Sequence, residues 1–156
     1  MQAGKIMIQG AFSLLFVLFV CQQIVFSGEL EITPGEKRRI ESGAIDTFET
    51  IISLWKREKF DELYEYGDRV SRELISKETF TSGMKSSCRL ASSWETGRDI
   101  EVEIISPKRV RLKAKMGFAS PSDEWGETVF FTLIFGITLD KDGWRIRLRK
   151  LLYCPF

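Results

Sequence analysis

The chain has 156 residues, of which 23 are Lys or Arg, 22 are Asp or Glu and none is His, so its formal net charge is +1. Asparagine is also absent, and all glutamines lie within the first 23 residues. This composition excludes histidine-ligated zinc or haem sites, histidine-based catalytic triads and asparagine-linked sugars. The balanced charge gives no reason to expect a nucleic-acid partner.

Residues 1–27 have the order of a secretory signal. Lys5 is the single charged residue of this segment, and an apolar run over residues 11–20 follows it. The small residues Ser27 and Gly28 come at the end, which predicts cleavage between them. Cleavage there would export the rest of the chain to the periplasm or out of the cell.

A second interpretation of the N-terminus keeps it as a membrane anchor. Residues 6–26 are long enough to cross a bilayer if they are not cleaved, although they contain three glutamines. Lipid attachment at Cys21 is not expected, because Val20 is larger than the residue that a lipoprotein signal places before its cysteine. The cleaved and the anchored forms both export the remaining residues.

The first part of the exported chain predicts helices. Residues 28–41 read as a polar lead-in, and an amphipathic helix is expected from Ser42 onward. Its apolar residues recur at intervals of three and four and form one stripe. That stripe consists of Ile45, Phe48, Ile51, Ile52 and Trp55.

Two shorter helices are expected next. Residues 60–66 fit a helix that Gly67 terminates. Ser76 is placed to cap a third helix, which carries the apolar residues Phe80 and Met84 on one face.

After Gly97 the hydrophobic period changes to two, which predicts strands with one buried face. A polar loop over residues 119–127 and a hairpin turn over residues 140–143 separate the later strands. The four apolar rows are Ile100, Val102 and Ile104; Val110, Leu112, Ala114, Met116 and Phe118; Val129, Phe131, Leu133, Phe135, Ile137 and Leu139; and Trp144, Ile146 and Leu148.

Charge complementarity predicts how these strands pair. A loop over residues 106–108 sets the acids of the first strand opposite the bases of the second and leaves the apolar residues on the other face. A slip of one residue would exchange the two faces, so a single register is expected. The predicted pairs are Ile105–Arg109, Ile104–Val110, Glu103–Arg111, Val102–Leu112, Glu101–Lys113, Ile100–Ala114 and Asp99–Lys115, and then Leu139–Trp144, Ile137–Ile146 and Phe135–Leu148.

Helices followed by an antiparallel meander predict an α+β fold with the helices on one face of the sheet. Four stretches of this sequence resemble the nuclear transport factor two-like superfamily, which includes ketosteroid isomerases and polyketide cyclases. They are the opening helix with Phe48 and Trp55, residues 60–66, residues 75–80 and the hairpin at residues 139–145.

The resemblance spans roughly residues 42–153 and implies a single domain over residues 42–156. It implies a cone-like fold, in which a curved four-stranded sheet wraps around the helices and a pocket opens at one end. The superfamily hosts enzymes and non-enzymes on this scaffold, so the fold does not decide the function.

The resemblance also implies where catalytic groups would lie, because enzymes of the superfamily place Asp, His or Tyr inside the cone. The inward-facing strand positions of this chain are nearly all aliphatic or aromatic, and none matches the catalytic Asp. We therefore expect a non-catalytic binding module for a small apolar ligand or a partner protein, with no cofactor and no metal. The candidate pocket residues are Trp55, Tyr64, Trp94, Met116, Phe118, Phe131 and Phe135.

An alternative is an isomerase or cyclase that works in the same pocket. Without histidine, acid–base chemistry would need a carboxylate with a raised pKa and the help of a tyrosine. Asp61, Glu62 and Glu65 lie next to Tyr64 and Tyr66 in the sequence. A helix with apolar residues inside and acids outside would produce the same pattern without any chemistry.

The two cysteines outside the signal predict a disulfide. Cys88 and Cys154 remain after removal of the signal, and in an oxidising compartment they are expected to form a disulfide, with two separate buried thiols as the alternative.

The last strand places Arg145, Arg147 and Arg149 on the outer face of the sheet, either as a solvated surface or as a site for an anionic ligand or partner. Phe130 and Ile134 share that face, which suggests a homodimer through the sheet face.

Overall fold

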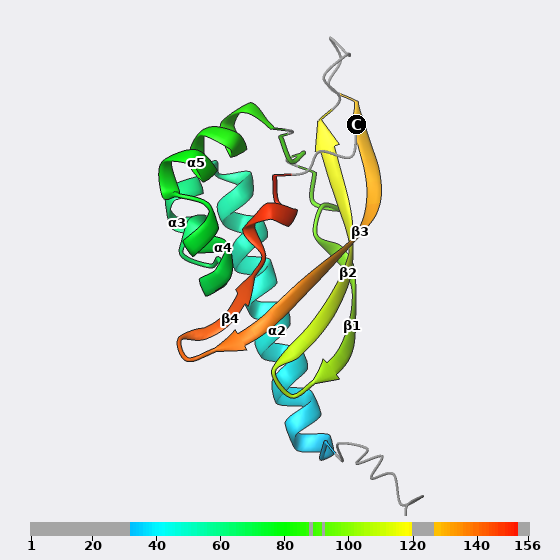
Figure 1. Cartoon of the computed structure of the whole chain (residues 1–156). Helices are drawn as coiled ribbons and strands as arrows, with labels where there is room; N and C mark the ends of the chain where they lie inside the picture. The colour runs from blue at the N-terminus through cyan, green and yellow to red at the C-terminus, as the bar shows by residue number, and fades with distance from the viewer. Residues whose placement is uncertain (1–31, 88, 92, 120–126, 153–156) are drawn as a thin grey trace, which may run out of the picture. The chain divides into compact units, whose positions relative to one another are not determined.

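The computed structural model describes residues 32–87, 89–91, 93–119 and 127–152, and the structural statements below concern those residues. The fold is α+β as predicted: helices come first, and a four-stranded antiparallel meander that the helices contact comes second (Figure 1). The predicted signal lies outside the described residues. The elements are α2 (Pro34–Lys56), α3 (Phe60–Tyr64), α4 (Arg69–Leu74), α5 (Lys77–Ser86), β1 (Arg98–Ser106), β2 (Arg109–Ala119), β3 (Thr128–Asp140), β4 (Gly143–Ile146) and the short 3-10 helix η2 (Leu148–Lys150).

Helix α2 begins at Pro34, well before the predicted start at Ser42, so the polar lead-in is wrong from Pro34 onward. Thr33 and Glu36 form a capping box: the Glu36 N–H donates to the Thr33 hydroxyl, and the Thr33 N–H donates to the Glu36 carboxylate. The Thr33 hydroxyl also donates to the Glu36 carboxylate at 2.7 Å, and this hydrogen bond, followed by the one from the Thr33 N–H, lowers the pKa of Glu36. A proline in the first turn has no N–H to leave unpaired, so Pro34 favours this start rather than breaking the helix.

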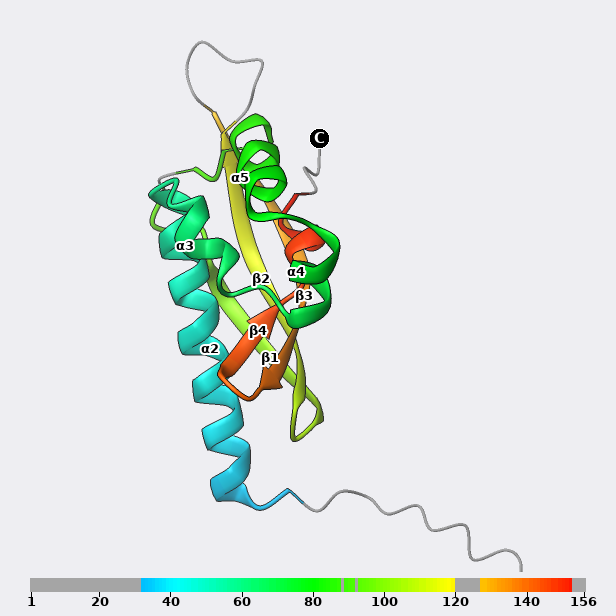
Figure 2. The same ribbon diagram turned by 60° about the vertical axis from the view of Figure 1, so that its left-hand side comes forward.

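The buried stripe of α2 packs against the inner face of the sheet. It runs through Ile40, Ala44, Phe48, Ile51, Ile52 and Trp55. The ring of Phe48 lies 5.1 Å from the ring of Phe135 on β3, centroid to centroid. Figure 2 shows α2 lying along the length of the sheet. None of the described helices combines the length and the apolar composition that a membrane crossing requires.

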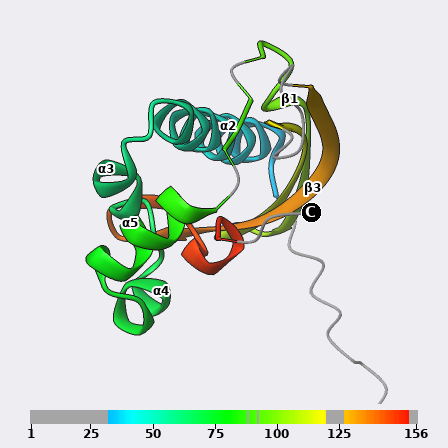
Figure 3. The ribbon, with the colours of Figure 1, turned by 90° about the horizontal axis from the view of Figure 1, so that it is seen from above.

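The three shorter helices form a group beside α2. In Figure 3 the sheet curves around one side of α2, and α3, α4 and α5 gather on the other side. Helix α3 ends at Tyr64, slightly earlier than predicted. Helix α4 is absent from the sequence prediction, although the Asp68 side chain caps it by accepting from the Ser71 N–H. The predicted cap of α5 is confirmed, because the Ser76 hydroxyl accepts from the Thr79 N–H.

The strand order β1-β2-β3-β4 and the central pairs of the first hairpin are as predicted. The two ends of that hairpin are not. Ser106 rather than Ile105 pairs with Arg109, and Arg98 rather than Asp99 pairs with Lys115. The predicted Ile100–Ala114 pair is not part of the register, because Ile100 lies in the shift between Arg98 and Glu101. Each end contains a shift of register, and Asp99 sits in a left-handed backbone conformation with φ 53°. Such an irregularity removes a residue from the ladder without exchanging the two faces of the strand.

Strand β4 ends at Ile146, earlier than predicted, and its outer edge is hydrogen-bonded to the segment between α3 and α4. The Ile146 N–H donates to the Tyr66 carbonyl at 2.9 Å, and the Asp68 N–H donates to the Ile146 carbonyl at 2.8 Å. The chain then turns into η2, so Leu148 does not pair with Phe135, although the predicted Ile137–Ile146 and Leu139–Trp144 pairs are present. Leu148 instead enters the core next to Gly67.

Candidate functional site

One hollow among the described residues has a volume of about 660 Å³. It lies between the C-terminal end of α2, the end of α5, the segment at residues 89–91 and the adjoining ends of β2 and β3. We call it the Trp55 hollow. Its volume falls in the range that small-molecule pockets usually have.

Buried apolar side chains form part of the wall of the Trp55 hollow, and one of them carries a polar group without a partner among the described residues. Trp55, Phe60, Met84 and Leu90 line it, and each is almost completely buried. The side chain of Trp55 is 4% exposed, and its Nε1–H has no acceptor among the described residues. A buried donor without a partner costs about 1–3 kcal/mol. Because the Nε1 atom itself is inaccessible to solvent, an acceptor on a bound molecule would recover that energy only if the indole shifted toward the hollow.

Charged side chains on the lining give the Trp55 hollow a net charge of +2. Lys56, Lys85 and Arg89 supply three positive charges, and Glu58 supplies the one negative charge. Lys85 is exposed and makes no ion pair with any described residue, so its charge is not compensated locally.

Lys56 is anchored by backbone groups. Its ammonium donates to the carbonyl oxygens of Ser93 at 3.1 Å and Thr96 at 3.2 Å. Burial, and to a smaller degree the nearby positive charge of Arg98, lowers the pKa of Lys56. This lysine therefore holds the segment before β1 against the end of α2 at the edge of the hollow.

Glu58 carries backbone strain at the same edge. It adopts a left-handed conformation with φ 57°, which costs about 1–2 kcal/mol for a residue with a Cβ atom. Its carboxylate accepts two hydrogen bonds from the guanidinium of Arg89, from Nε and from Nη2. The ion pair joins the turn after α2 to the segment that contains Leu90, and both segments line the hollow. Strain of this kind tends to occur at functional sites.

A second, smaller hollow of about 290 Å³ lies on the charged outer side of the sheet and includes Phe131 in its lining. Both of its lysines are paired: Lys113 with Glu101 and Lys115 with Glu95, each at 3.0 Å. The Lys115 ammonium also lies 4.6 Å from the centroid of the Phe130 ring. We regard this surface as a row of cross-strand ion pairs and not as a ligand site.

The candidate pocket residues from the sequence lie in different places. Met116, Phe118 and Phe135 are buried in the core and line neither hollow. Phe118 packs edge-on against Trp55, with 6.3 Å between ring centroids. Trp55 is therefore the one residue of the predicted set that lines the larger hollow, while Trp94 is 73% exposed and lines neither.

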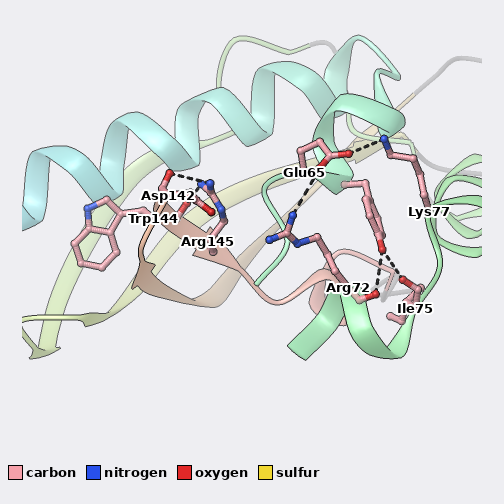
Figure 4. Close-up of polar contacts among 8 residues, drawn as sticks. Glu65, Arg72, Ile75, Lys77, Asp142, Trp144 and Arg145 are labelled. Atoms are coloured by element: carbon pink, nitrogen blue, oxygen red, sulfur yellow. Dashed lines mark hydrogen bonds and ion pairs between the residues drawn. The ribbon is translucent and has the colours of Figure 1, made fainter. Parts of the chain in front are cut away.

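Tyr64 belongs to a polar cluster that joins the short helices. Its hydroxyl donates to the carbonyl oxygens of Ile75 at 2.9 Å and Arg72 at 3.2 Å (Figure 4). Nearby, the Glu65 carboxylate lies 2.6 Å from the Lys77 ammonium, and this hydrogen bond is the main cause of the raised pKa of Lys77. Glu65 also pairs with Arg72 at 3.7 Å. These contacts explain Tyr64 and Glu65 as links between the short helices.

The predicted basic row does not form on a single strand. Arg145 lies on β4, and its guanidinium donates to the carbonyl oxygens of Asp142 and Trp144 (Figure 4). Arg147 follows the strand and pairs with Asp68 at 3.8 Å, while Arg149 lies on η2. The cause is the early end of β4, which removes the alternation that the row required.

Other chemical hypotheses find no support among the described residues. They contain no group of three or more metal-binding side chains. Glu58 is the one carboxylate in the lining of the Trp55 hollow; it is paired with Arg89, and no tyrosine shares that lining. Cys88 and Cys154 lie outside the described residues, so the disulfide stays a prediction.

Comparison with known proteins adds no relative to these observations. No protein-family model matches the chain, and no curated protein matches it either.

Proposed function

We propose that this chain is an exported, non-catalytic binding module that holds a small molecule with an apolar body and an anionic group in the Trp55 hollow. The observation that carries the proposal is the buried indole N–H of Trp55, which lacks an acceptor among the described residues that surround it. A carboxylate or similar oxygen on the ligand would accept a hydrogen bond from this donor. Such a hydrogen bond is stronger when the acceptor is charged than when it is neutral.

The lining of the Trp55 hollow has apolar and positively charged residues, which supports a ligand with an apolar body and an anionic group. Phe60, Met84 and Leu90 offer apolar surface to the body of the molecule. The net charge of +2 on the lining attracts an anion, and Lys85 has no competing partner among the described residues. A neutral ligand would gain the apolar contacts but not the electrostatic attraction.

Two sequence features support the remaining parts of the proposal. The signal-like order of residues 1–27 supports export. The resemblance to the nuclear transport factor two-like superfamily supports a pocket at one end of the sheet, in a scaffold that hosts non-enzymes as well as enzymes. The wholly aliphatic or aromatic inner positions of β2 support binding rather than catalysis.

Calorimetry with three matched probes tests the proposal. The protein, purified after expression of the full chain, is titrated with decanoate, decan-1-ol and decyltrimethylammonium, which share an alkyl chain and differ in charge. We expect decanoate to bind most tightly. Replacing Lys85 with glutamate changes the net charge of the lining from +2 to zero, and it should weaken decanoate binding by about tenfold without changing the affinity for decan-1-ol.

Lys108→Glu is the matched control, because it makes the same charge change at an exposed residue outside the lining of the hollow. It should leave decanoate binding unaltered. Failure of all three probes to bind would contradict the proposal. Equal affinities for decanoate and decan-1-ol would contradict the anionic part of it.

A further inference from the structure

Strand β3 is much longer than the strand that covers its outer edge. β2 pairs with β3 from Thr128 to Thr138, whereas β4 pairs with it only from Ile137 to Asp140. Residues 128–136 therefore have no strand on that side among the described residues (Figure 1). A strand edge of this length is a template for pairing with another chain.

The hydrogen bonds show which backbone groups this open edge presents. The Leu139 N–H donates to the Lys108 carbonyl, on the side of β2. Alternate residues of a strand direct their N–H and C=O groups to opposite edges, so the odd-numbered residues of β3 face β2. The even-numbered residues face the open edge, and they are Thr128, Phe130, Thr132, Ile134 and Gly136.

The open edge lacks the features that usually prevent strands from joining. Natural proteins protect such edges with charged side chains, prolines or bulges. Residues 128–139 contain no charged residue and no proline, and the β2–β3 register runs without a shift. Ile134, which lies in the middle of the segment, is 55% exposed. A partner strand with charged side chains would find no charge to pair with here.

We propose that two copies of this chain join antiparallel through the open edge of β3 and form one continuous sheet. A two-fold axis at Thr132, the midpoint of residues 128–136, pairs the whole open segment with itself. It places Thr132 opposite Thr132 of the second copy and Phe130 opposite Ile134 of the second copy. The free backbone N–H and C=O groups of the two open edges therefore face one another. Aromatic and β-branched residues form favourable cross-strand pairs.

Sedimentation velocity tests this edge with a matched pair of variants, applied to protein expressed from the full chain. Over an about hundred-fold range of concentration we expect the wild-type protein to be a dimer that dissociates on dilution. Ile134→Lys should raise the dissociation constant at least about tenfold, because it replaces the apolar residue opposite Phe130 of the second copy with lysine, a residue that natural edge strands use to prevent pairing. Ile105→Lys makes the same change at a residue of β1 that is 45% exposed, and it should leave the dimer intact.

Hydrogen exchange provides a readout that needs no variant. The amides of Phe130, Thr132, Ile134 and Gly136 should exchange slowly in concentrated protein and faster on dilution, while those of the odd-numbered residues stay protected by β2 in both. A wild-type protein that is monomeric throughout overturns the proposal. A dimer in which these four amides exchange freely, or one that Ile105→Lys weakens as much as Ile134→Lys does, also overturns it.

Discussion

Replacing Phe48 with alanine is expected to lower the free energy of unfolding by about 3–5 kcal/mol. Phe48 is completely buried in the middle of α2, and its ring contacts Phe135 of β3 at 5.1 Å between centroids. Truncation removes apolar area from the contact between helix and sheet and leaves a cavity that its rigid neighbours cannot fill. The loss is a large part of the stability of a typical domain. Chemical denaturation followed by circular dichroism measures it.

Glu49 provides the control for this measurement. It is the next residue of α2 and is exposed, so Glu49→Ala should change the stability by less than about 0.5 kcal/mol. Equal effects of the two substitutions would show that α2 does not cover the sheet through Phe48.

Replacing Gly67 with alanine is expected to destabilise the protein by about 1–3 kcal/mol, although it adds a single methyl group. A Cβ atom at this position would lie 2.6 Å from two carbons of the Leu148 side chain, far inside van der Waals contact. Leu148 is completely buried and cannot move aside without disturbing the core. Gly67 lets the segment between α3 and α4 approach the end of β4, where Tyr66 and Asp68 hydrogen-bond to Ile146.

A double-mutant cycle separates this clash from any effect of glycine on the unfolded chain. Leu148→Ala destabilises the protein on its own, but it also removes the atoms that a Cβ at Gly67 would meet. In that background Gly67→Ala should cost almost nothing in a denaturation experiment. A cost that stays the same in both backgrounds would contradict the close approach.

The parts of the fold that the sequence predicted are those that local pattern determines. Charge and hydrophobicity agree along β1 and β2, and the Lys113–Glu101 pair is found as expected. The same agreement is weaker at the ends of that hairpin, where Asp99 and Ile105 fall beside register shifts. The missed start of α2 did have a local signal, because Thr33 and Glu36 have the spacing of a capping box.

The parts that the sequence did not predict depend on contacts between distant segments. β4 ends at Ile146, where the chain turns into η2 and where Tyr66 and Asp68 hydrogen-bond to the edge of β4 that faces away from β3. Lys85 and Arg89 look like ordinary surface residues in the sequence, and tertiary contacts bring them to the same hollow as Trp55. An unpartnered indole N–H is a property of the packed structure, so no sequence pattern could have indicated it.

The most direct test of the proposed binding site is the indole N–H signal of Trp55 in a nitrogen–proton correlation spectrum, recorded while decanoate is added. The chain has four tryptophans, and the Trp55 signal is identified by its absence from the Trp55→Phe variant. We expect this signal to move downfield with saturation, as Nε1–H gains an acceptor, while the exposed Trp94 keeps its position. Decanoate binding that leaves the Trp55 signal in place would contradict the account.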